Sequence, residues 1–416
     1  MGSQGYYFKD DCRLCESRNL VRVMELSPTP PGNHFVSAAE RDKPQTFYPL
    51  EVYFCNDCAH VQLGHVVDPE ILYRRNYSYV SATSPVFVAH LRDYAIWMQK
   101  TYALAPRGLI VDIGSNDGTA LGFFKDAGFR VVGVDLAIEI AQLARERGVE
   151  TICEFFSAER AAKWRDEYGP ADLITSHNAC AHIDNLKDVF EGARCWLAAD
   201  GLLVIEVGYL LDVYENAWFD TIYHEHLDYH SVKPLVAVFA NLDLQVIDVH
   251  RISPQGGSIR VIAQKAGGAR EVKDSVAALV NLEEGVGLHR AETFVALNER
   301  INGVKERLRE LVTALKADGK SIAGFGAPTK ATTLLTHFDL GNVLDFLVDE
   351  NPLKQNLYSP GHHIPVLPAE AIYERRPDYV LILAWNFAEN IMQRHRRYRD
   401  RGGRFILPMP EPCIVS

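Results

Sequence analysis

The stretch that decides the fold is residues 108–135, GLIVDIGSNDGTALGFFKDAGFRVVGVD. Its apolar start, residues 109–111, runs into an acid and a glycine loop, after which residues 119–127 have helical spacing. This order predicts a strand, a tight loop and a helix. A second strand, residues 130–134, is followed by Asp135. We therefore expect this carboxylate at the carboxyl edge of a parallel sheet, where ligands of open α/β sheets bind.

The glycine spacing of the loop distinguishes between cofactors. A dinucleotide-binding loop has the pattern G-x-G-x-x-G around a pyrophosphate. Here three residues separate Gly114 from Gly118, and acids stand on both sides, Asp112 and Asp117. Acids repel a pyrophosphate but suit the sulfonium and amino groups of S-adenosylmethionine. The pattern resembles the first two motifs of class I methyltransferases, although an ordinary βα turn with structural glycines is the alternative. The candidate cofactor-binding residues are Asp112, Gly114, Asn116, Asp117, Gly118, Asp135 and Asn178.

Length and charge exclude several classes of partner. The 416 residues predict two or three domains. A formal net charge of -11 argues against broad binding to a phosphate backbone. No apolar run approaches the roughly 20 residues that a membrane span needs, and the N-terminus lacks a signal segment. We expect a cytoplasmic monomer with neither a nucleic-acid nor a membrane partner.

Four of the eight cysteines form two C-x-x-C pairs, Cys12 with Cys15 and Cys55 with Cys58. Two such pairs supply the tetrahedral thiolate set that structural zinc prefers, and four thiolates leave no open position for catalysis. The residues between the pairs, including the proline-rich segment 28–32, are expected to form an extended excursion. A redox pair or unrelated surface cysteines are the alternatives.

The chain then continues as βαβ units. A third strand at residues 171–176 leads into a loop, residues 177–183, that places Asn178 and His182 on the cofactor side of the sheet. The segment 184–187 can cap the next helix. A fourth strand is expected at residues 201–207, two more strands lie within residues 246–265, and a long helical pattern runs from 288 to about 317.

Two polar segments are candidates for a ligand site. Residues 76–84 hold serine, threonine and tyrosine side chains that suit a loop over a polar ligand, with packing as the alternative. Residues 220–231 hold three histidines and three carboxylates, which fit general acid/base chemistry. Zinc binding by His224 and His226 is a weaker interpretation because the H-x-H spacing is not that of H-E-x-x-H. A solvated polar loop is a further alternative.

A second α/β pattern begins at residues 320–330, again as strand, glycine loop and helix, with Lys330 placed to suit a diphosphate. Further strands are expected at residues 343–348, 379–384 and 404–407. Three polar loops between them favour a ligand site at one edge of this sheet: residues 349–356, 359–366 and 384–386.

The order of these parts is informative. After the zinc segment and the methyltransferase fold come Tyr-x-Glu-His, Gly-x-Gly-Ala-x-x-Lys, Lys-Gln-Asn, Pro-Gly-x-His-Ile-Pro-Val and Ala-Trp-Asn. Over essentially the whole chain, this order resembles the sugar C-methyltransferase family of bacterial deoxysugar biosynthesis, such as the C-3' enzymes of tetronitrose and mycarose pathways. The resemblance implies a three-domain α/β protein: a zinc-binding domain (1–75), a Rossmann-like S-adenosylmethionine-binding methyltransferase domain with a linker helix (76–310), and a Rossmann-like nucleotide-sugar domain (311–416).

The resemblance also implies a reaction, methylation of the ring carbon beside the ketone of a nucleotide-linked 4-keto-6-deoxy sugar, with dTDP or GDP as the nucleotide. Matching the family's motifs gives His226 as the base, with Tyr223 and Glu225 positioning the sugar and the enolate. The family's other active-site histidine and tyrosine match His182 and Tyr79, with Tyr77 as the alternative to Tyr79. The implied substrate-binding residues are Lys330, Lys354, Asn356, His363 and Trp385. O- or N-methylation of a sugar, a non-catalytic S-adenosylmethionine or sugar-nucleotide sensor, and a sugar-nucleotide dehydrogenase are the other functions considered.

Overall fold

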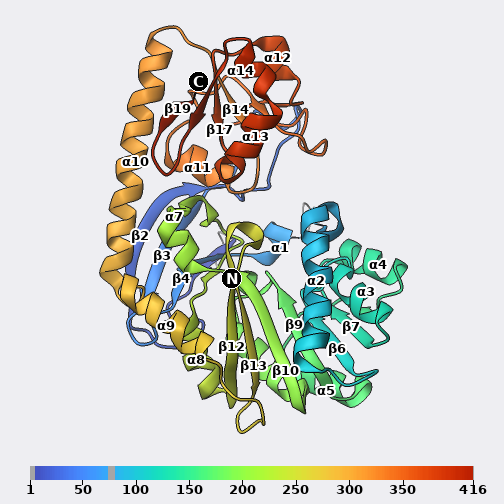
Figure 1. Ribbon diagram of the computed structural model, residues 1–416. Helices are drawn as coiled ribbons and strands as arrows, with labels where there is room; N and C mark the ends of the chain where they lie inside the picture. The colour runs from blue at the N-terminus through green and yellow to red at the C-terminus, as the bar shows by residue number, and fades with distance from the viewer. Residues whose placement is uncertain (1–4, 74–79, 416) are drawn as a thin grey trace.

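A computed structural model describes residues 5–73 and 80–415 of the chain. The described residues form four β-sheets in three regions along the molecule (Figure 1). The blue N-terminal strands lie between the green and yellow methyltransferase sheet and the red C-terminal domain, and the long helix α10 (Ala291–Ala317) runs along one side toward the C-terminal domain.

The N-terminal region is an antiparallel four-stranded sheet with a small two-stranded sheet beside it. The four strands, in spatial order, are β11 (Asp228–Tyr229), β4 (Val61–Leu63), β3 (Tyr48–Cys55) and β2 (Leu20–Thr29). β1 (Tyr6–Phe8) pairs with β5 (His65–Val67). β11 belongs to the polar segment 220–231, so the chain returns from the methyltransferase domain to add a strand to this sheet.

The methyltransferase domain is built on a seven-stranded sheet. Its strands, in spatial order, are β12 (Leu244–Ile252), β13 (Ser258–Lys265), β10 (Leu197–Gly208), β9 (Ala171–His177), β6 (Leu109–Ile113), β7 (Arg130–Val134) and β8 (Thr151–Ile152). The strands from β10 to β8 are parallel, and β13 runs antiparallel to both of its neighbours. The predicted strand, loop and helix order of residues 108–135 is confirmed.

Helices cover both faces of this sheet, which explains the near-continuous apolar strands. Ile110 packs in one core cluster with residues of α2 (Pro85–Tyr102) and α3 (Thr119–Asp126). Its neighbours Leu109 and Val111 face the other core, with α5 (Ala158–Tyr168) and α6 (Leu186–Trp196). The side chain of Asn185 caps α6, as its position predicts.

The remaining helices of the N-terminal region and of the domain with the seven-stranded sheet connect strands or border the sheets. They are α1 (Pro69–Tyr73), α4 (Ile138–Glu146), α7 (Leu210–Asn216), α8 (Val232–Asn241) and α9 (Asp274–Val286), with short 3-10 turns η1 (Ser81–Thr83), η2 (Cys180–His182), η3 (Phe219–Thr221) and η4 (Pro254–Gly256).

Helix α10 does more than link two domains. Its buried residues recur every three to four positions, from Phe294 to Val312, which is the spacing of one helix face. The Phe294 ring lies 5.8 Å from that of Phe54 on β3. The helix therefore packs its apolar face on the N-terminal sheet.

The C-terminal domain contains a six-stranded sheet. Its strands, in spatial order, are β16 (Val366–Leu367), β15 (Leu347–Val348), β14 (Ile322–Phe325), β17 (Tyr379–Ile382), β18 (Arg404–Leu407) and β19 (Cys413–Val415). β19 is antiparallel to its neighbour and the others are parallel. The helices are α11 (Ala331–His337), α12 (Ala371–Arg375), α13 (Ala388–Arg394) and α14 (Arg396–Asp400), with the turn η5 (Trp385–Phe387).

One strand is shorter than the sequence indicates. Residues 343–348 were expected to form a strand, but only Leu347 and Val348 pair as one. The amide of Val343 instead donates to Leu340 O, 3.1 Å away, and closes a turn. Among residues 5–73 and 80–415, no helix has the length and hydropathy that crossing a membrane requires.

Candidate active site

The four paired cysteines meet at one point. Their Sγ atoms all lie within 4.8 Å of one another, and Cys12–Cys58 and Cys15–Cys55 are each separated by 3.6 Å. A tetrahedral zinc with Zn–S bonds of about 2.3 Å places its sulfur ligands about 3.8 Å apart. The arrangement therefore fits one Zn²⁺ with no open coordination position, which is a structural site.

The glycine loop of the methyltransferase domain is closely packed. Gly114 has φ +72°, and a Cβ added there would lie 2.4 Å from Cβ of Ala179, in the loop after β9. Gly118, with φ +74°, precedes the first residue of α3. Both positions favour glycine because other residues rarely adopt this conformation. The close approach brings the first loop of the domain against the segment that leads to His182.

Asp135 lies at the predicted sheet edge. Its carboxylate accepts hydrogen bonds from the amides of Asn116 (2.8 Å) and Ala137 (2.9 Å). Burial raises the pKa of Asp135, and these two amide bonds oppose that rise. The side-chain oxygen of Asn116 in turn accepts from the amide of Ser81, 2.9 Å away, so residues just after position 79 lie over this loop.

Asp112 has a carboxylate oxygen free to receive a cation. The residue is 2% exposed, and its Oδ1 has no hydrogen-bond partner in the described part of the chain. Nδ1 of His177 lies 3.7 Å away, and burial raises the pKa of Asp112. A buried carboxylate oxygen without a hydrogen bond is costly. The amino group of S-adenosylmethionine would satisfy it, so the donor set fits this cofactor.

The neighbouring acids have protein partners. Glu206 accepts from His90 Nε2 (2.7 Å) and Arg260 Nε (2.5 Å). Burial raises its pKa, but His90, His177 and Arg260 together bring it down to about 2. Asp117 pairs with Arg147 (2.5 Å) and accepts from the Thr119 hydroxyl (2.6 Å). Since Arg147 already neutralises Asp117, Asp112 is better placed to meet a cofactor cation.

Asn178 follows the end of β9, at the same sheet edge. It has φ +59°, and its amide donates to Glu206 O, 2.7 Å away. The backbone of Asn178 is therefore fixed beside these carboxylates. From this position its side chain can contact the cofactor.

His226 is held at both ring nitrogens. Nδ1 lies 2.8 Å from Thr221 O, and Nε2 lies 2.8 Å from the hydroxyl of Tyr223. A carbonyl oxygen only accepts, so Nδ1 carries the proton and Tyr223 donates to Nε2. Burial, with a smaller contribution from the nearby His182, lowers the pKa of His226 to about 3. The imidazole is neutral at pH 7, which is the form that can accept a proton.

His182 is a direct neighbour of His226. The two rings are 5.0 Å apart at an interplanar angle of 68°. Burial lowers the pKa of His182 to about 4. Because His182 is only three residues beyond Ala179, which packs against Gly114, one short segment links the glycine loop to the residue that contacts His226.

Glu225 faces the N-terminal region. Its Oε1 accepts from Nδ2 of Asn33, 3.3 Å away, and Oδ1 of Asn33 accepts from the hydroxyl of Thr329, 2.7 Å away. Burial raises the pKa of Glu225 to about 7, while Asn33 and Lys354 oppose that rise. A carboxyl group with a pKa near neutrality is typical of functional sites.

His224 points away from His226. Its Nε2 lies 3.2 Å from Tyr48 O, and its ring packs 5.7 Å from that of Tyr48. Within residues 5–73 and 80–415, the four cysteines are the only group of three or more potential ligands close enough to share an ion. The described residues therefore offer no third ligand that could hold an ion together with His224 and His226. Tyr79, and its alternative Tyr77, lie outside the described residues.

Two predicted substrate residues converge at the boundary with the C-terminal domain. Lys330 Nζ donates to Asn386 Oδ1 (2.8 Å) and lies 5.6 Å from the Trp385 ring centroid. The indole N–H of Trp385 donates to Asp220 Oδ2, 2.9 Å away. Lys330 and Trp385 are thus brought together, with Asp220 of the methyltransferase domain between them.

The other three residues predicted to bind substrate lie along loops that face the segment between the two cysteine pairs, residues 16–54. Lys354 Nζ donates to Ala327 O (2.8 Å) and lies 5.2 Å from the Phe35 ring centroid. His363 Nε2 is 3.2 Å from Gln45 Oε1. Asn356 has φ +65°, and its amide donates to Val366 O (2.8 Å). Lys354 also acts electrostatically on Glu225, whose pKa it lowers.

The sequence did not indicate three residues that contact the predicted site residues. They are Asn33, Gln45 and Asp220, the last as the partner of Trp385. Gly32 offers the clearest signal for Asn33, because a Cβ there would lie 2.7 Å from Thr329 O. A glycine and an asparagine after three prolines indicate a close backbone approach, but not its partner.

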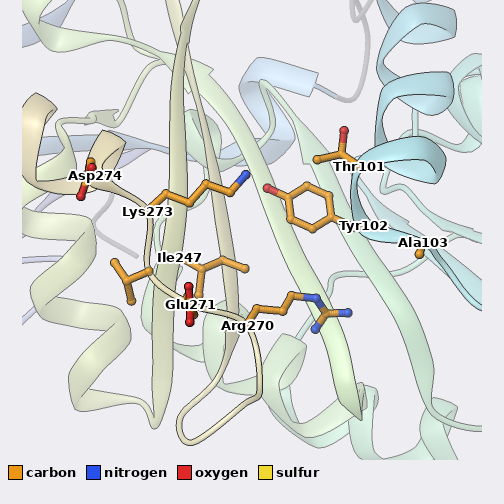
Figure 2. Close-up of a pocket in the computed structure, with 9 residues that line it drawn as sticks. Thr101, Tyr102, Ala103, Ile247, Arg270, Glu271, Lys273 and Asp274 are labelled. Carbon is orange, nitrogen blue, oxygen red and sulfur yellow. The ribbon is translucent and has the colours of Figure 1, made fainter.

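A separate open cavity of about 640 Å³ is lined by residues of the α2 terminus and the segment before α9 (Figure 2). Two of its polar side chains share one acceptor: Lys273 Nζ donates to Asp248 Oδ2 (2.8 Å), and the Tyr102 hydroxyl donates to the same oxygen (3.1 Å). Arg270 donates to Asp200 O (2.9 Å), near the start of β10. The cavity therefore lies toward the opposite edge of the sheet from the cofactor loop.

Fold and site together define an S-adenosylmethionine-dependent methyltransferase with a structural zinc module and an additional α/β domain. Family models match in the same order: "zinc binding domain" at residues 12–73, "methyltransferase domain" at 87–249 and "C-methyltransferase C-terminal domain" at 253–410. The chain is 37% identical to the C-methyltransferase NovU of Streptomyces niveus over 408 residues, 98% of this chain and 97% of NovU. It belongs to the C-methyltransferase family.

Solved structures resemble parts of the chain. A Pyrococcus horikoshii protein is 18% identical and covers 46% of this chain and 97% of its own, with a TM-score of 0.38. The magnesium protoporphyrin IX methyltransferase of Synechocystis PCC 6803, with bound SAH, is 13% identical and covers 43% of this chain and 83% of its own, with a TM-score of 0.35.

Proposed function

We propose that this C-methyltransferase acts at C-3' of a nucleotide-linked 4-keto-6-deoxy sugar, with dTDP or GDP as the nucleotide and His226 as the base. The observation that carries the proposal is the hydrogen-bond chain Tyr223–His226–Thr221, with both distances 2.8 Å. It provides a neutral imidazole and a phenol side by side, one residue from Glu225. Such a set suits removal of a proton next to a carbonyl group.

Carbon methylation requires a carbon nucleophile, and S-adenosylmethionine supplies an electrophilic methyl group. Nε2 of His226 takes the C-3' proton, and the electron pair of the C–H bond moves toward the C-4' oxygen. Tyr223 turns its O–H from Nε2 to that oxygen and stabilises the enolate, a role for preorganised donors. The C-3' carbon then forms the new bond to the methyl group as the methyl–sulfur bond breaks.

Glu225 and His182 surround the base and position the sugar in this proposal. The raised pKa of Glu225, about 7 because of burial, lets the side chain donate or accept a hydrogen bond near neutral pH. His182 presents an edge to the His226 ring. Tyr79, which precedes η1 in the sequence, completes the proposed set.

The nucleotide part of the substrate is assigned to the C-terminal domain. Lys330 and Lys354 supply two cations next to the glycine loop after β14, where a diphosphate can be neutralised. Asn356, His363 and Trp385 complete the proposed cleft. Burial lowers the pKa of Lys354, so an anion beside it would stabilise its charged form.

The test is a panel of dTDP- and GDP-linked 4-keto-6-deoxy sugars, each incubated with S-adenosylmethionine in deuterated water and analysed by mass spectrometry. We expect one substrate to gain a methyl group at C-3' and solvent deuterium to enter that position when S-adenosylhomocysteine replaces the methyl donor. Methylation on oxygen or nitrogen without exchange at C-3' would overturn the proposed mechanism, and so would the absence of both reactions with every sugar.

A further inference from the structure

The base is oriented by a backbone carbonyl that belongs to a segment held by another domain. Nδ1 of His226 bonds to Thr221 O, 2.8 Å away. Thr221 is the last residue of η3, and the residues on either side of it, Asp220 and Ile222, both bond to the C-terminal domain. The position of this carbonyl therefore depends on two hydrogen bonds that cross the domain boundary.

Asp220 is the more unusual of the two. The residue is fully buried, and its Oδ2 accepts from the indole N–H of Trp385 (2.9 Å) and lies 3.8 Å from Nζ of Lys330. Its Oδ1 has no hydrogen-bond partner within the described ranges. A buried carboxylate is costly unless its partners compensate for desolvation. Its presence here is explained if it performs a task that an apolar residue could not.

The second of the two hydrogen bonds and a ring contact also fix this segment. The Thr333 hydroxyl donates to Ile222 O, 2.8 Å away. The Phe219 ring stacks on Phe338 with centroids 4.8 Å apart and an interplanar angle of 17°. All of these partners belong to α11 or to the residue that follows it. The C-terminal domain thus contacts residues 219–222, just before the base, at several points.

We propose that Asp220 is a positioning residue: bonded to Trp385, it lets the C-terminal domain set the orientation and tautomer of His226. The inference rests on the proposed function, which makes His226 the base. It also changes the role of Trp385. The only N–H of the indole already donates to Asp220, so Trp385 serves the base rather than recognising the sugar by a hydrogen bond.

The variant Trp385→Phe tests this role, because it keeps an aromatic ring but removes the donor to Asp220. Asp220→Asn is the second variant, since its amide oxygen can still accept from Trp385 while the charge is lost. Phe387→Leu is the matched control: Phe387 lies in the same turn, η5, but its side chain is 59% exposed. For each protein, kcat and KM are measured with the sugar found by the panel, and S-adenosylmethionine binding is measured by calorimetry.

A second readout follows the base directly. In protein labelled with ¹⁵N-histidine, the His226 ring signals are identified by their loss in His226→Asn, and they report which nitrogen carries the proton. In Trp385→Phe we expect kcat to fall about 10- to 100-fold, as misplacement of a reacting group does. KM and cofactor binding should change less than about threefold, and the His226 signals should shift toward a mixture of tautomers. Asp220→Asn should retain more activity than Trp385→Phe.

The opposite pattern overturns the inference. If Trp385→Phe raises KM while kcat and the His226 signals stay as in Phe387→Leu, Trp385 contacts the sugar and does not position the base. If the unmodified enzyme methylates no 4-keto sugar, the proposed function fails. The tautomer comparison needs no substrate, so it still decides whether Asp220 and Trp385 orient His226.

Discussion

The hydroxyl of Tyr223 lies 2.8 Å from Nε2 of His226, and this bond occupies the lone pair that a general base must use. The phenol therefore covers Nε2 of His226. Because Nδ1 is bonded to the Thr221 carbonyl, the ring cannot turn to offer its other nitrogen without losing that bond. In the proposed mechanism the Tyr223 hydroxyl leaves Nε2 when His226 takes the proton, and it then donates to the developing enolate oxygen.

The first prediction concerns the base. His226→Asn should lower methyl transfer by about 10²- to 10⁴-fold, the usual contribution of a general base, while the affinity for S-adenosylmethionine stays near that of the unmodified enzyme. Single-turnover methyl transfer and calorimetry measure the two quantities. Near-normal turnover in this variant would remove His226 from the role of base.

The second prediction concerns Tyr223. Tyr223→Phe keeps the ring that packs 4.2 Å from that of His226 but removes the hydroxyl. We expect solvent deuterium exchange at C-3' to be retained in part, because Nε2 is then uncovered, whereas methyl transfer should fall about 10-fold or more because the enolate loses a donor. Exchange and methylation falling by the same factor would show that the hydroxyl does not act on the enolate separately from the base.

The third prediction is the pH dependence contributed by Glu225. Burial raises its pKa from 4.5 to about 7 in the folded protein. The folded state then holds this proton more tightly than the unfolded state, so the stabilisation is complete below about pH 4.5 and is lost as pH rises through about 7. Glu225→Gln lacks this titration and keeps an acceptor for Asn33.

Urea unfolding of both proteins between about pH 5 and pH 8 isolates that contribution. The free energy of unfolding of the unmodified protein, minus that of Glu225→Gln, should fall with rising pH at up to about 1.4 kcal/mol per unit. Other groups titrate in both proteins and cancel in the difference. A difference independent of pH would contradict the raised pKa.

The fourth prediction concerns the cofactor loop. Gly114→Ala places a Cβ 2.4 Å from that of Ala179 and at φ +72°, so the loop must shift and the Kd for S-adenosylmethionine should rise about 10-fold or more. Gly122→Ala is the control, because that helical position has no atom within 4 Å of the added Cβ and alanine favours helix. Equal affinities in the two variants would separate this loop from cofactor binding.

The fifth prediction concerns the zinc site. Cys55→Ser should reduce the bound zinc below one ion per chain and lower the midpoint of thermal unfolding, because four thiolates are needed to close a structural site. Cys413→Ser, at an exposed cysteine outside the cluster, should leave both values unchanged. Metal analysis and differential scanning fluorimetry give the two readouts. Full zinc occupancy in Cys55→Ser would show that Cys55 is not a ligand.

Local chemistry was enough to determine much of this protein. The strands of the methyltransferase sheet are apolar runs because helices cover both faces, and the spacing of the four cysteines predicted a cluster that the fold closes. The acids around the glycine loop indicated the class of cofactor. Each of these signals lies within a few residues, where steric and hydrogen-bonding rules act directly.

Only the tertiary structure decided what surrounds the base. The Asn33–Glu225 bond joins residues 192 positions apart, and the Trp385–Asp220 bond joins residues 165 apart. A side chain such as Asp220 has no local pattern that distinguishes a solvated acid from a buried anchor. Its environment comes from the packing of the C-terminal domain against η3, and that packing depends on the shapes of whole domains rather than on any short stretch of sequence.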